Sequence, residues 1–323
     1  MNKGISKIAC VVVAYNNGSN IGNLVEALLT QSKPVEEIIV IDNASSDDTA
    51  KIVKERFPQV TLLENASNTG VGGGYAQGME YAYQKGYEWV WLLDGDSLPQ
   101  TTALEELGKA FASLRSTHPK IGILASCPIN PLTGVRYDGF LRRDLFKTLV
   151  KEIPFSDAIH SVDAVISSGS LVNRKVIEEV GLTRVDFFMD YVDTEYCFRI
   201  RRKGYEIIYV PSSLIYQDMG GMGIAPPALS RIGRIVTRFV GKREPRRLHP
   251  PWRYYYIMRN ELYTFWHEFR DYKAVFYFVL FVAFKIAYMY LYKDDKKAQK
   301  IKYTLLGIKD GLKGKLGKTI SPE

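Results

Sequence analysis

The sequence predicts an α/β protein with a doubly wound, mostly parallel sheet flanked by helices, followed by a helical C-terminal region. Two observations lead to this prediction. Over roughly the first 100 residues, short β-branched runs alternate with stretches whose apolar residues recur at helical spacing. Beyond Pro226 the composition becomes basic and aromatic. Strands that alternate with helices pair in parallel, because each helix returns the chain to the same end of the sheet.

The first strand is expected at residues 8–14 (IACVVVA), a continuous β-branched run that is typical of a strand buried on both faces. Apolar residues repeat at helical spacing over 21–29 and predict a helix. A second buried strand follows at 37–42 (EIIVID), then a helix around 49–57 and a third, short strand at 60–64. This order of elements is the one that parallel pairing requires.

A glycine-rich loop is expected next, at Gly70–Gly74, with a helix over Tyr75–Lys85 and a fourth strand over Glu88–Leu93. The loop is not a P-loop, because no Gly-Lys-Ser/Thr follows it. It is not a dinucleotide fingerprint either, because Tyr75 stands where the third glycine would be. Glycines let a backbone approach a ligand closely, and tight-turn packing alone is the alternative explanation.

Polar residues gather where the predicted strands end. Ligands bind at the carboxyl ends of the strands in open parallel sheets. The polar residues at the three strand ends are Asn16 and Asn17, Asp42 and Asn43, and Asp94 and Asp96. We therefore expect one binding site that is assembled from these three ends.

The charge of the chain is uneven and predicts two regions. The net charge of the 323 residues is +8. From Pro226 onward there are 21 Lys and Arg against 8 Asp and Glu, whereas the part before it has 22 against 27. A basic region of this kind indicates a polyanionic partner. We expect a catalytic domain over 1–225 and a basic, aromatic-rich helical region over 226–323.

The apolar run Ala274–Tyr292 lies within that basic region. Its length is about that of a membrane span, but Lys285 interrupts it and aromatic residues crowd it. An amphipathic helix that lies on or partly in an anionic membrane surface is favoured over a true span or a buried helix. Lipid fits this mixture of residues better than nucleic acid, so no nucleic-acid partner is expected.

The cysteines and the N-terminus indicate a location. Cys10, Cys127 and Cys197 form no CxxC pair, which fits a reducing compartment. The short polar stretch before residue 8 lacks the features of a signal peptide. We expect a cytoplasmic protein that is attached peripherally to the inner face of the cell membrane.

Asp94-Gly95-Asp96 is the sharpest chemical signal in the sequence. Two carboxylates one residue apart at a strand end can bind a hard divalent cation, which prefers oxygen ligands and also binds phosphate oxygens. A cation that bridges a diphosphate neutralises the charge of the leaving group. The alternative is an acidic turn without an ion, which the position at the end of a buried strand disfavours.

Asp42 ends the second predicted strand. Its carboxylate can accept the N3–H of a pyrimidine base, and the alternative is an N-cap or Asx turn for the next helix. Asp47 and Asp48 are better placed for that capping role.

The stretch 187–204 (FFMDYVDTEYCFRIRRKG) predicts a helix that begins near Asp190, with acids in its first turn and bases at its end. This distribution suits the helix dipole without any catalytic role. The functional alternative is that one acid is a general base that accepts a proton from an acceptor hydroxyl. The spacing by itself does not decide between the two.

Taken together, the segments VVVAYN, IVIDNASSD, NTG, LLDGDS, SSGSLV, FFMDYVDTEYCFR and GYEIIYVP resemble the family 2 glycosyltransferases, which have the GT-A fold. Among these, the sequence is most similar to bacterial rhamnosyltransferases and galactofuranosyltransferases of cell-surface polysaccharide synthesis. The resemblance extends from Ile8 to Gly221, and its motifs occur in family order.

The resemblance implies roles for individual residues. Asp96 would bind Mg²⁺ or Mn²⁺, and Asp193 would be the catalytic base. Family members often carry a further histidine metal ligand where this chain has Gln217 and Asp218, so these two are candidate ligands. The donor nucleotide would be bound by Ala14, Tyr15, Asn16, Asp42, Asn68, Gly70 and Asp94. The donor or acceptor sugar would contact Ser168, Gly169, Asp190 and Glu195.

The implied reaction is an inverting, metal-dependent transfer of one or a few sugars, because the QxxRW signature of processive members is absent. The segment LLDGDS favours dTDP-rhamnose as the donor, and the glycine-rich NTGVGGG favours UDP-galactofuranose as the alternative. A lipid-linked glycan is the expected acceptor, since it would explain the membrane-seeking tail.

Two other classes of protein fit the sequence less well. A nucleotidyltransferase would need a glycine-rich triphosphate loop with Lys or Arg near its N-terminus, which residues 16–19 (NNGS) do not supply. A non-catalytic membrane scaffold would keep the basic tail, but it would not need Asp94, Asp96 and Asp193 together.

Overall fold

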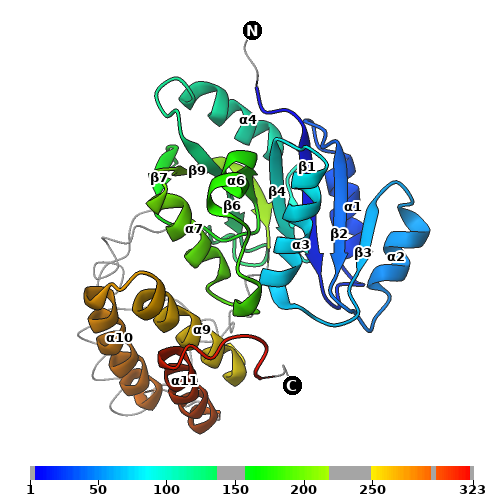
Figure 1. Cartoon of the computed structure of the whole chain (residues 1–323). Coiled ribbons are helices and arrows are strands. Elements are labelled where there is room, and N and C mark those ends of the chain that lie inside the picture. The colour runs from blue at the N-terminus through cyan, green and yellow to red at the C-terminus, as the bar shows by residue number, and fades with distance from the viewer. Residues whose placement is uncertain (1–3, 137–156, 218–248, 292–295, 321–323) are drawn as a thin grey trace. The chain divides into compact units, whose positions relative to one another are not determined.

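The computed structural model describes residues 4–136, 157–217, 249–291 and 296–320. The chain divides into two compact units, Met1–Asp218 and Met219–Glu323. The first unit holds a sheet with helices on both faces, and the second is helical (Figure 1). Each unit is described by itself below.

Over residues 4–136 and 157–217, the first unit is built on a nine-stranded sheet in the order β3-β2-β1-β4-β8-β6-β9-β5, with β7 paired to β9. Its strands are β1 Ile8–Ala14, β2 Glu37–Asp42, β3 Thr61–Glu64, β4 Trp89–Asp94, β5 Leu98–Pro99, β6 Ile121–Ile129, β7 His160–Val162, β8 Ser170–Asn173 and β9 Glu206–Tyr216. The first four strands begin and end within one residue of the positions that the sequence predicted.

The sheet is mixed, with most strands in one direction. Strand β1 pairs in parallel with β2 and β4, and β2 pairs in parallel with β3. Strand β8 runs antiparallel between β4 and β6, and β6 pairs in parallel with β9. The short strands β5 and β7 are antiparallel to β9. The parallel front half is confirmed, and the antiparallel strands lie in the part that sequence periodicity did not assign.

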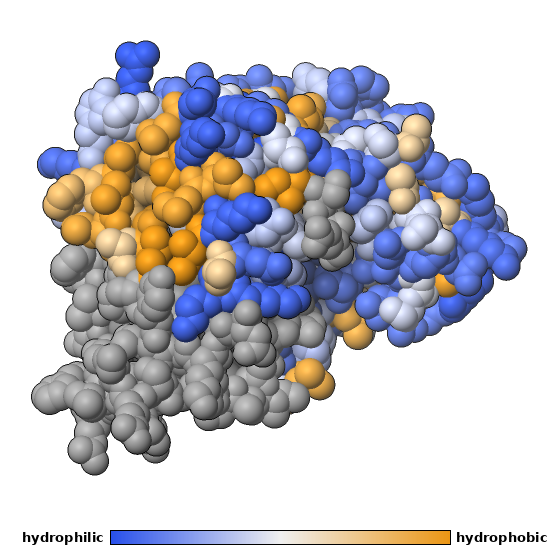
Figure 2. Space-filling view, turned by 90° about the horizontal axis from the view of Figure 1, so that it is seen from below, coloured by the Kyte–Doolittle hydropathy of each residue, from blue (hydrophilic) through white to orange (hydrophobic). Residues whose placement is uncertain are grey.

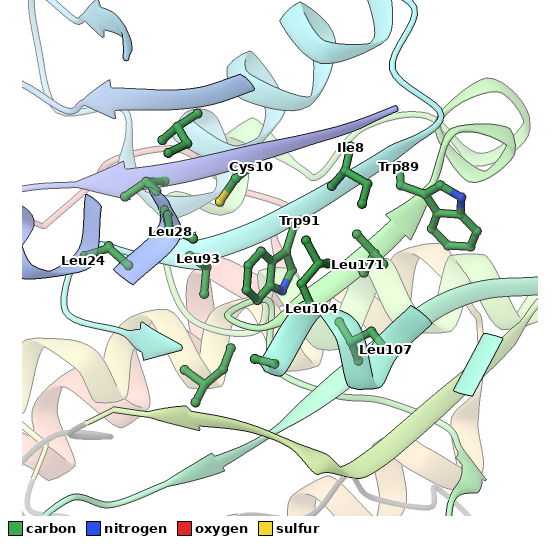
Figure 3. Close-up of a cluster of buried hydrophobic side chains, with 14 of the residues drawn as sticks. Ile8, Cys10, Leu24, Leu28, Trp89, Trp91, Leu93, Leu104, Leu107 and Leu171 are labelled. Carbon is green, nitrogen blue, oxygen red and sulfur yellow. The ribbon is translucent and has the colours of Figure 1, made fainter. Parts of the chain in front are cut away.

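Helices cover both faces of this sheet. They are α1 Ile21–Leu29, α2 Thr49–Arg56, α3 Gly70–Gln84, α4 Ala103–Leu114, α6 Arg174–Val180 and α7 Val192–Arg202. Side chains of α1, α2 and α4 share one core cluster with the residues of β1 and β4 that point to that face. Figure 3 shows Leu24 and Leu28 of α1 and Leu104 and Leu107 of α4 around Trp91 in this cluster. Helices α3, α6 and α7 cover the other face (Figure 1).

The predicted glycine-rich loop is instead the start of helix α3, which begins at Gly70. These glycines allow close packing. A Cβ atom added at Gly74 would lie 2.7 Å from Cγ1 of Val13, and one at Gly78 would lie 2.2 Å from Cγ1 of Val11. The helix therefore lies directly on strand β1, at a distance that a side chain would prevent. Sequence reasoning ended the loop too late because glycine is a weak helix former.

The register of the sheet collects the strand ends at one edge. Ala14 lies opposite Asp42, and Val13 lies opposite Asp94. Backbone hydrogen bonds continue this pairing by one residue on each side. Asn43 N–H donates to the Ala14 carbonyl at 2.8 Å, and Gly95 N–H donates to the Val13 carbonyl at 2.9 Å. The three strand ends that the sequence marked as polar thus form one edge.

The second unit contains α9 Pro251–Tyr263, a π-helical turn Thr264–Glu268, α10 Tyr272–Leu291 and α11 Lys297–Leu312. Helices α9 and α11 approach closely, because a Cβ at Gly307 would lie 2.4 Å from the Tyr255 carbonyl oxygen. Arg259 is fully buried beside them and donates to the Gly317 carbonyl at 2.6 Å. Its guanidinium also lies over the Tyr256 ring, 4.8 Å from the centroid.

Within the described ranges, no helix combines the length and the apolar character that crossing a bilayer requires.

The contact between α3 and β1 yields a stability prediction. We expect Gly78→Ala to destabilise the protein by about 1–3 kcal/mol, because the added methyl would overlap a buried, β-branched Val11 side chain. Gly108→Ala on α4 is the matched control, since its Cβ would meet only Lys33 Cδ at 3.7 Å. That control should stabilise by about 0.5–1 kcal/mol through helix propensity. Urea denaturation followed by circular dichroism measures both, and equal midpoints for the two variants would refute the packing argument.

Candidate active site

The segment Asp94–Ser97 turns sharply at the end of β4 and leads into β5, which pairs with β9. Ser97 N–H donates to the Asp94 carbonyl at 3.0 Å, and Leu98 of β5 pairs with Tyr216 of β9. This antiparallel pairing brings Gln217, the residue after β9, beside the two carboxylates. Gln217 N–H donates to the Ile129 carbonyl at 3.0 Å, which holds its backbone in place.

Neutral donors engage both oxygens of the Asp94 carboxylate. The buried Tyr75 hydroxyl donates to Oδ1 at 2.6 Å, and Gln217 Nε2 donates to Oδ2 at 2.9 Å. The same Nε2 donates to Asp96 Oδ1 at 3.1 Å. Sequence reasoning missed Tyr75 as a site residue, because it lies within α3 and reaches the site from a different layer of the fold. Its place in the glycine-rich segment was the available signal.

Ser168 forms hydrogen bonds with two residues of the acidic turn, Asp94 and Ser97. Its Oγ accepts from Asp94 N–H at 3.2 Å and lies 2.6 Å from the Ser97 hydroxyl. Gly169 N–H donates to the Leu92 carbonyl at 2.7 Å, with a φ of 87°. Ser168 is buried. The structure therefore places Ser168 and Gly169, predicted as sugar contacts, as supports for the turn that carries Asp94.

Asp193 lies in the first turn of α7, directly after a strained stretch of backbone. Phe188, Asp190 and Tyr191 have φ angles of 65°, 56° and 66°. Left-handed backbone at non-glycine residues costs free energy and is concentrated at functional sites. Helix α7 begins at Val192 instead of near Asp190 because these residues are not helical. Asp193 Oδ1 accepts from Thr194 N–H at 2.7 Å.

The surroundings of Asp193 raise its pKa to about 6. Burial is the main cause, because it disfavours the charged form. The negative charges of Asp190 and Asp94 act in the same direction, against a hydrogen bond from Thr194. Burial, Asp94, Asp96 and Asp193 likewise raise the pKa of the Tyr75 hydroxyl. The three predicted acids therefore share one electrostatic environment around Tyr75.

Glu195 has a structural role. It is fully buried, and Arg199 forms a bidentate ion pair with it. Arg199 also donates to the carbonyls of Val180 and Leu182 at 2.9 and 2.8 Å. The pair thus holds the connection between α6 and α7. We leave Glu195 out of the proposed site, although the sequence resemblance implied a sugar contact.

Asp42 is buried, and its Oδ1 has no hydrogen-bond partner. Its Oδ2 accepts from Ser45 N–H at 3.2 Å, which is the turn contact that the alternative explanation requires. Asp47 accepts from Thr49 N–H at 3.0 Å at the start of α2. Of the two residues expected to cap α2, Asp47 makes the contact, whereas Asp48 is the N-cap residue and its side chain forms no capping hydrogen bond. One oxygen of Asp42 remains available for a ligand.

The loop after β1 is held against the loop after β2. Asn16, with a φ of 54°, accepts at Oδ1 from Ser46 N–H at 2.8 Å, and its own N–H donates to the Ser45 hydroxyl. Tyr15 is 45% exposed, whereas Ala14 is buried. Of these three predicted nucleotide-binding residues, Tyr15 presents its side chain, Asn16 organises the loop, and Ala14 can contribute backbone alone.

Asn68 and Gly70 lie where the chain enters α3, at the same edge of the sheet. Asn68 Oδ1 accepts from Gly70 N–H at 2.8 Å. A Cβ at Gly70 would lie 2.0 Å from the Phe188 carbonyl oxygen, so packing alone requires glycine there. Asn43, one of the polar residues at the predicted strand ends, fixes this turn by donating to the Gly70 carbonyl and accepting from Thr69 N–H, at 2.9 and 3.0 Å.

The residues at the acidic turn suit Mg²⁺ or Mn²⁺, although the set is small. Asp96 is exposed, and both cations prefer oxygen ligands of this kind. Across the described parts of the chain, no three His, Cys, Asp or Glu side chains are arranged to hold an ion. The carbonyl oxygen of Gln217 could add a ligand to the oxygens of Asp94 and Asp96, because it is buried and has no hydrogen-bond partner. Asp218, the other candidate, lies outside the described residues.

Curated proteins resemble this chain over much of its length. The dTDP-rhamnosyl transferase RfbF of Shigella flexneri is 25% identical over 267 residues, which cover 79% of this chain and 78% of that protein. The galactofuranosyltransferase GlfT1 of Mycolicibacterium smegmatis is 26% identical over 206 residues, covering 61% of this chain and 66% of that protein.

The fold has a counterpart among solved structures. The crystal structure of GalNAc-T7 with UDP, GalNAc and Mn²⁺ matches with a TM-score of 0.55 and 14% identity, over 96% of this chain and 56% of that one. A match at this identity concerns the fold, which is the GT-A arrangement of a mostly parallel sheet between helices. The family model for glycosyl transferase family 2 matches residues 9–180, which is more than half of the chain. The chain therefore belongs to glycosyl transferase family 2 and is a glycosyltransferase.

Proposed function

We propose that this glycosyltransferase moves a sugar from a nucleoside diphosphate donor to an acceptor hydroxyl in a single, inverting displacement, with Asp193 as the general base. The observation that carries the proposal is the position of Asp193. Its carboxyl group has a pKa of about 6 and lies in the electrostatic field of Asp94, at the edge where the strands end. A base of this strength is ionised at neutral pH and still accepts a proton in the transition state.

The chemistry requires one proton transfer and one displacement. The Asp193 carboxylate accepts the proton of the acceptor hydroxyl, whose oxygen forms a bond to the anomeric carbon. The bond from that carbon to the diphosphate oxygen breaks, and the diphosphate leaves with the electron pair from the opposite side. The configuration at the anomeric carbon is therefore inverted. A bound Mg²⁺ or Mn²⁺ at Asp96 would neutralise charge on the diphosphate.

Asp42 supports a donor with a uracil or thymine base. Its buried, unpartnered Oδ1 can accept the N3–H that both bases carry, and cytosine lacks this donor at neutral pH. The named activities of the relatives agree with these bases, since one is a dTDP-rhamnosyl transferase. Within this class we place dTDP-rhamnose first and UDP-galactofuranose second. Packing accounts for the glycines at 70–74, so they no longer argue for galactofuranose.

A donor panel tests the proposal. Purified protein is incubated with dTDP-rhamnose, UDP-galactofuranose, UDP-galactose and UDP-glucose, each with Mn²⁺, Mg²⁺ or EDTA, and binding and slow donor hydrolysis are measured. We expect dTDP-rhamnose to bind and hydrolyse. If none of these donors binds under any metal condition, the proposal fails, and a non-catalytic membrane scaffold becomes the better explanation.

Replacing the base separates its role from donor binding. With the productive donor, Asp193→Asn should lower kcat by about 10²–10⁴-fold, because the amide cannot accept the proton, while donor affinity is unchanged. Glu178→Gln is the matched control. It removes an exposed acid that is paired with Arg174 on α6, away from the carboxyl ends of the parallel strands. Turnover should therefore be unchanged. Near-normal turnover in Asp193→Asn would rule out the assigned base.

The raised pKa predicts the pH dependence of catalysis. A protonated Asp193 cannot accept a proton, so kcat/KM should fall as the pH drops through about 6. An aspartate with an ordinary pKa of about 3.9 would keep its activity to much lower pH. Asp190→Asn removes one of the negative neighbours that raise this pKa, so the acidic limb should move to lower pH. A limb that stays in place in Asp190→Asn would contradict the electrostatic explanation.

We also propose that the acceptor is a lipid-linked glycan and that the second unit lies on the anionic, cytoplasmic surface of the cell membrane. Helix α10 supports this, because apolar side chains on one of its faces are exposed. They are spaced as i, i+4, i+7 and i+8, which are neighbouring positions on a helix. These residues are Tyr272, Phe276, Val279 and Leu280. Figure 2 shows a hydrophobic area on the face of the molecule seen from below.

Helix α11 adds positive charge beside exposed apolar groups. Lys302, Leu305, Lys309 and Leu312 are all exposed and recur at helical spacing along one side. Lysines near a membrane are attracted by anionic lipid headgroups, whereas exposed leucines insert among the acyl chains. Together with the excess of basic residues beyond Pro226, this supports lipid as the partner.

Vesicle flotation tests the membrane proposal. The full chain should float with vesicles that contain an anionic phospholipid, and less with purely zwitterionic vesicles or at high salt. The double variant Phe276→Ser/Leu280→Ser should weaken binding by at least about tenfold, since each change removes roughly 1.5–3 kcal/mol of apolar transfer. Leu132→Ser, at a leucine of the first unit that is 78% exposed, is the matched control. Equal flotation of all three proteins would contradict the proposal.

A further inference from the structure

Gln217 occupies the place between the two carboxylates of the acidic turn. Its Nε2 donates to Asp94 Oδ2 at 2.9 Å and to Asp96 Oδ1 at 3.1 Å. One amide nitrogen thus bridges both acids. The side chain is 6% exposed, so water contributes little to its environment.

The other end of the same amide is unusual. Gln217 Oε1 is buried and has no hydrogen-bond partner, whereas buried carbonyl oxygens in proteins almost always have one. Gln31 provides the contrast within this chain. It is equally buried, but its Nε2 donates to two backbone carbonyls and its Oε1 accepts from Leu104 N–H. The orphaned oxygen is therefore a feature of Gln217 and not of buried glutamines in general.

Electrostatics explains why the amide points this way. With no cation between them, the carboxylates of Asp94 and Asp96 attract the partly positive NH₂ group and repel the carbonyl oxygen. A divalent cation at the same place would reverse both preferences, because it binds oxygen and repels the NH₂ group. Half a turn of the amide exchanges the two ends with little change of shape.

We propose that Gln217 is a cation-responsive ligand. Without a cation its NH₂ group bridges Asp94 and Asp96 and holds the two carboxylates together. When Mg²⁺ or Mn²⁺ binds to these carboxylates, the amide turns and its Oε1 becomes a ligand. This inference deepens the proposed function, on which its choice of cation rests.

The proposal has a direct consequence for affinity. The amide oxygen is neutral, so it is a weaker ligand than a carboxylate, and the NH₂ hydrogen bonds must break before the cation binds. The chain should therefore bind Mn²⁺ weakly in the absence of donor. Gln217→Glu removes the NH₂ group and supplies a charged oxygen. Gln217→Met is similar in size and supplies neither.

Mn²⁺ binding to the purified full chain, measured by the loss of the free Mn²⁺ signal in electron paramagnetic resonance, tests this order. We expect Gln217→Glu to bind at least about tenfold more tightly than the wild type, and Gln217→Met to bind more weakly than the wild type. Gln31→Met, at the other buried glutamine, should bind Mn²⁺ as the wild type does. Circular dichroism checks that each variant is folded.

Several results would overturn the inference. If Gln217→Met binds Mn²⁺ as tightly as the wild type or more tightly, the amide only obstructs the site. If no protein binds Mn²⁺, Gln217 has no role as a ligand. The base assignment would survive that result if glycosyl transfer persists in EDTA and is lost in Asp193→Asn, so the two failures can be told apart.

A second measurement does not depend on the folding of a variant. In the ¹⁵N-labelled wild-type protein, the side-chain NH₂ resonances of Gln217 should shift when diamagnetic Mg²⁺ is added, because both of its hydrogen bonds are lost. The NH₂ resonances of Gln31 should stay in place. Unchanged Gln217 resonances at saturating Mg²⁺ would overturn the proposal.

Discussion

The burial of mutually repelling carboxylates at one edge of the sheet is the constraint on which this candidate active site depends. Burial is the main cause of the raised pKa of Asp193, and the negative charges of Asp190 and Asp94 raise it further. Neutral hydrogen-bond donors offset part of this repulsion, since the Tyr75 hydroxyl and the Gln217 amide together engage both oxygens of Asp94. The site thus binds both oxygens of Asp94 with neutral donors and leaves Asp193 basic enough to accept a proton.

The sheet produces this concentration of charge through two kinds of pairing. Parallel strands place their carboxyl ends side by side, which brings the ends of β1, β2 and β4 together. The antiparallel pair of β5 and β9 then returns a distant part of the chain to the same edge, with Leu98 opposite Tyr216. The groups that we propose for catalysis and nucleotide binding are far apart in sequence, and the paired strands hold them at one edge, which suits a reaction that depends on alignment.

Much of the front half could be predicted from sequence, because its strands are continuous β-branched runs and its polar residues stand where those runs end. The mixed half could not. Strand β8 is four residues long, and its antiparallel place between β4 and β6 depends on tertiary contacts that have no periodic signature. Tyr75 was missed as a site residue for a similar reason, since its hydroxyl reaches Asp94 across two layers of the fold. Glu195 and Arg199 stand four residues apart in the helix that the sequence predicted, so their ion pair could have been inferred from the spacing.

The glycines of α3 link two halves of the site that the sequence keeps far apart. Gly70 packs against the Phe188 carbonyl, and Gly72 packs against the Arg184 carbonyl at a separation that no side chain allows. The start of α3, where we propose that the nucleotide binds, and the strained stretch before Asp193 are therefore closely packed against each other. In a chimera between relatives, residues 68–74 and 184–193 would have to be exchanged together. Either segment grafted alone would pack against a backbone whose conformation fits a different sequence. Donor choice and the placement of the base would then be inherited as one module.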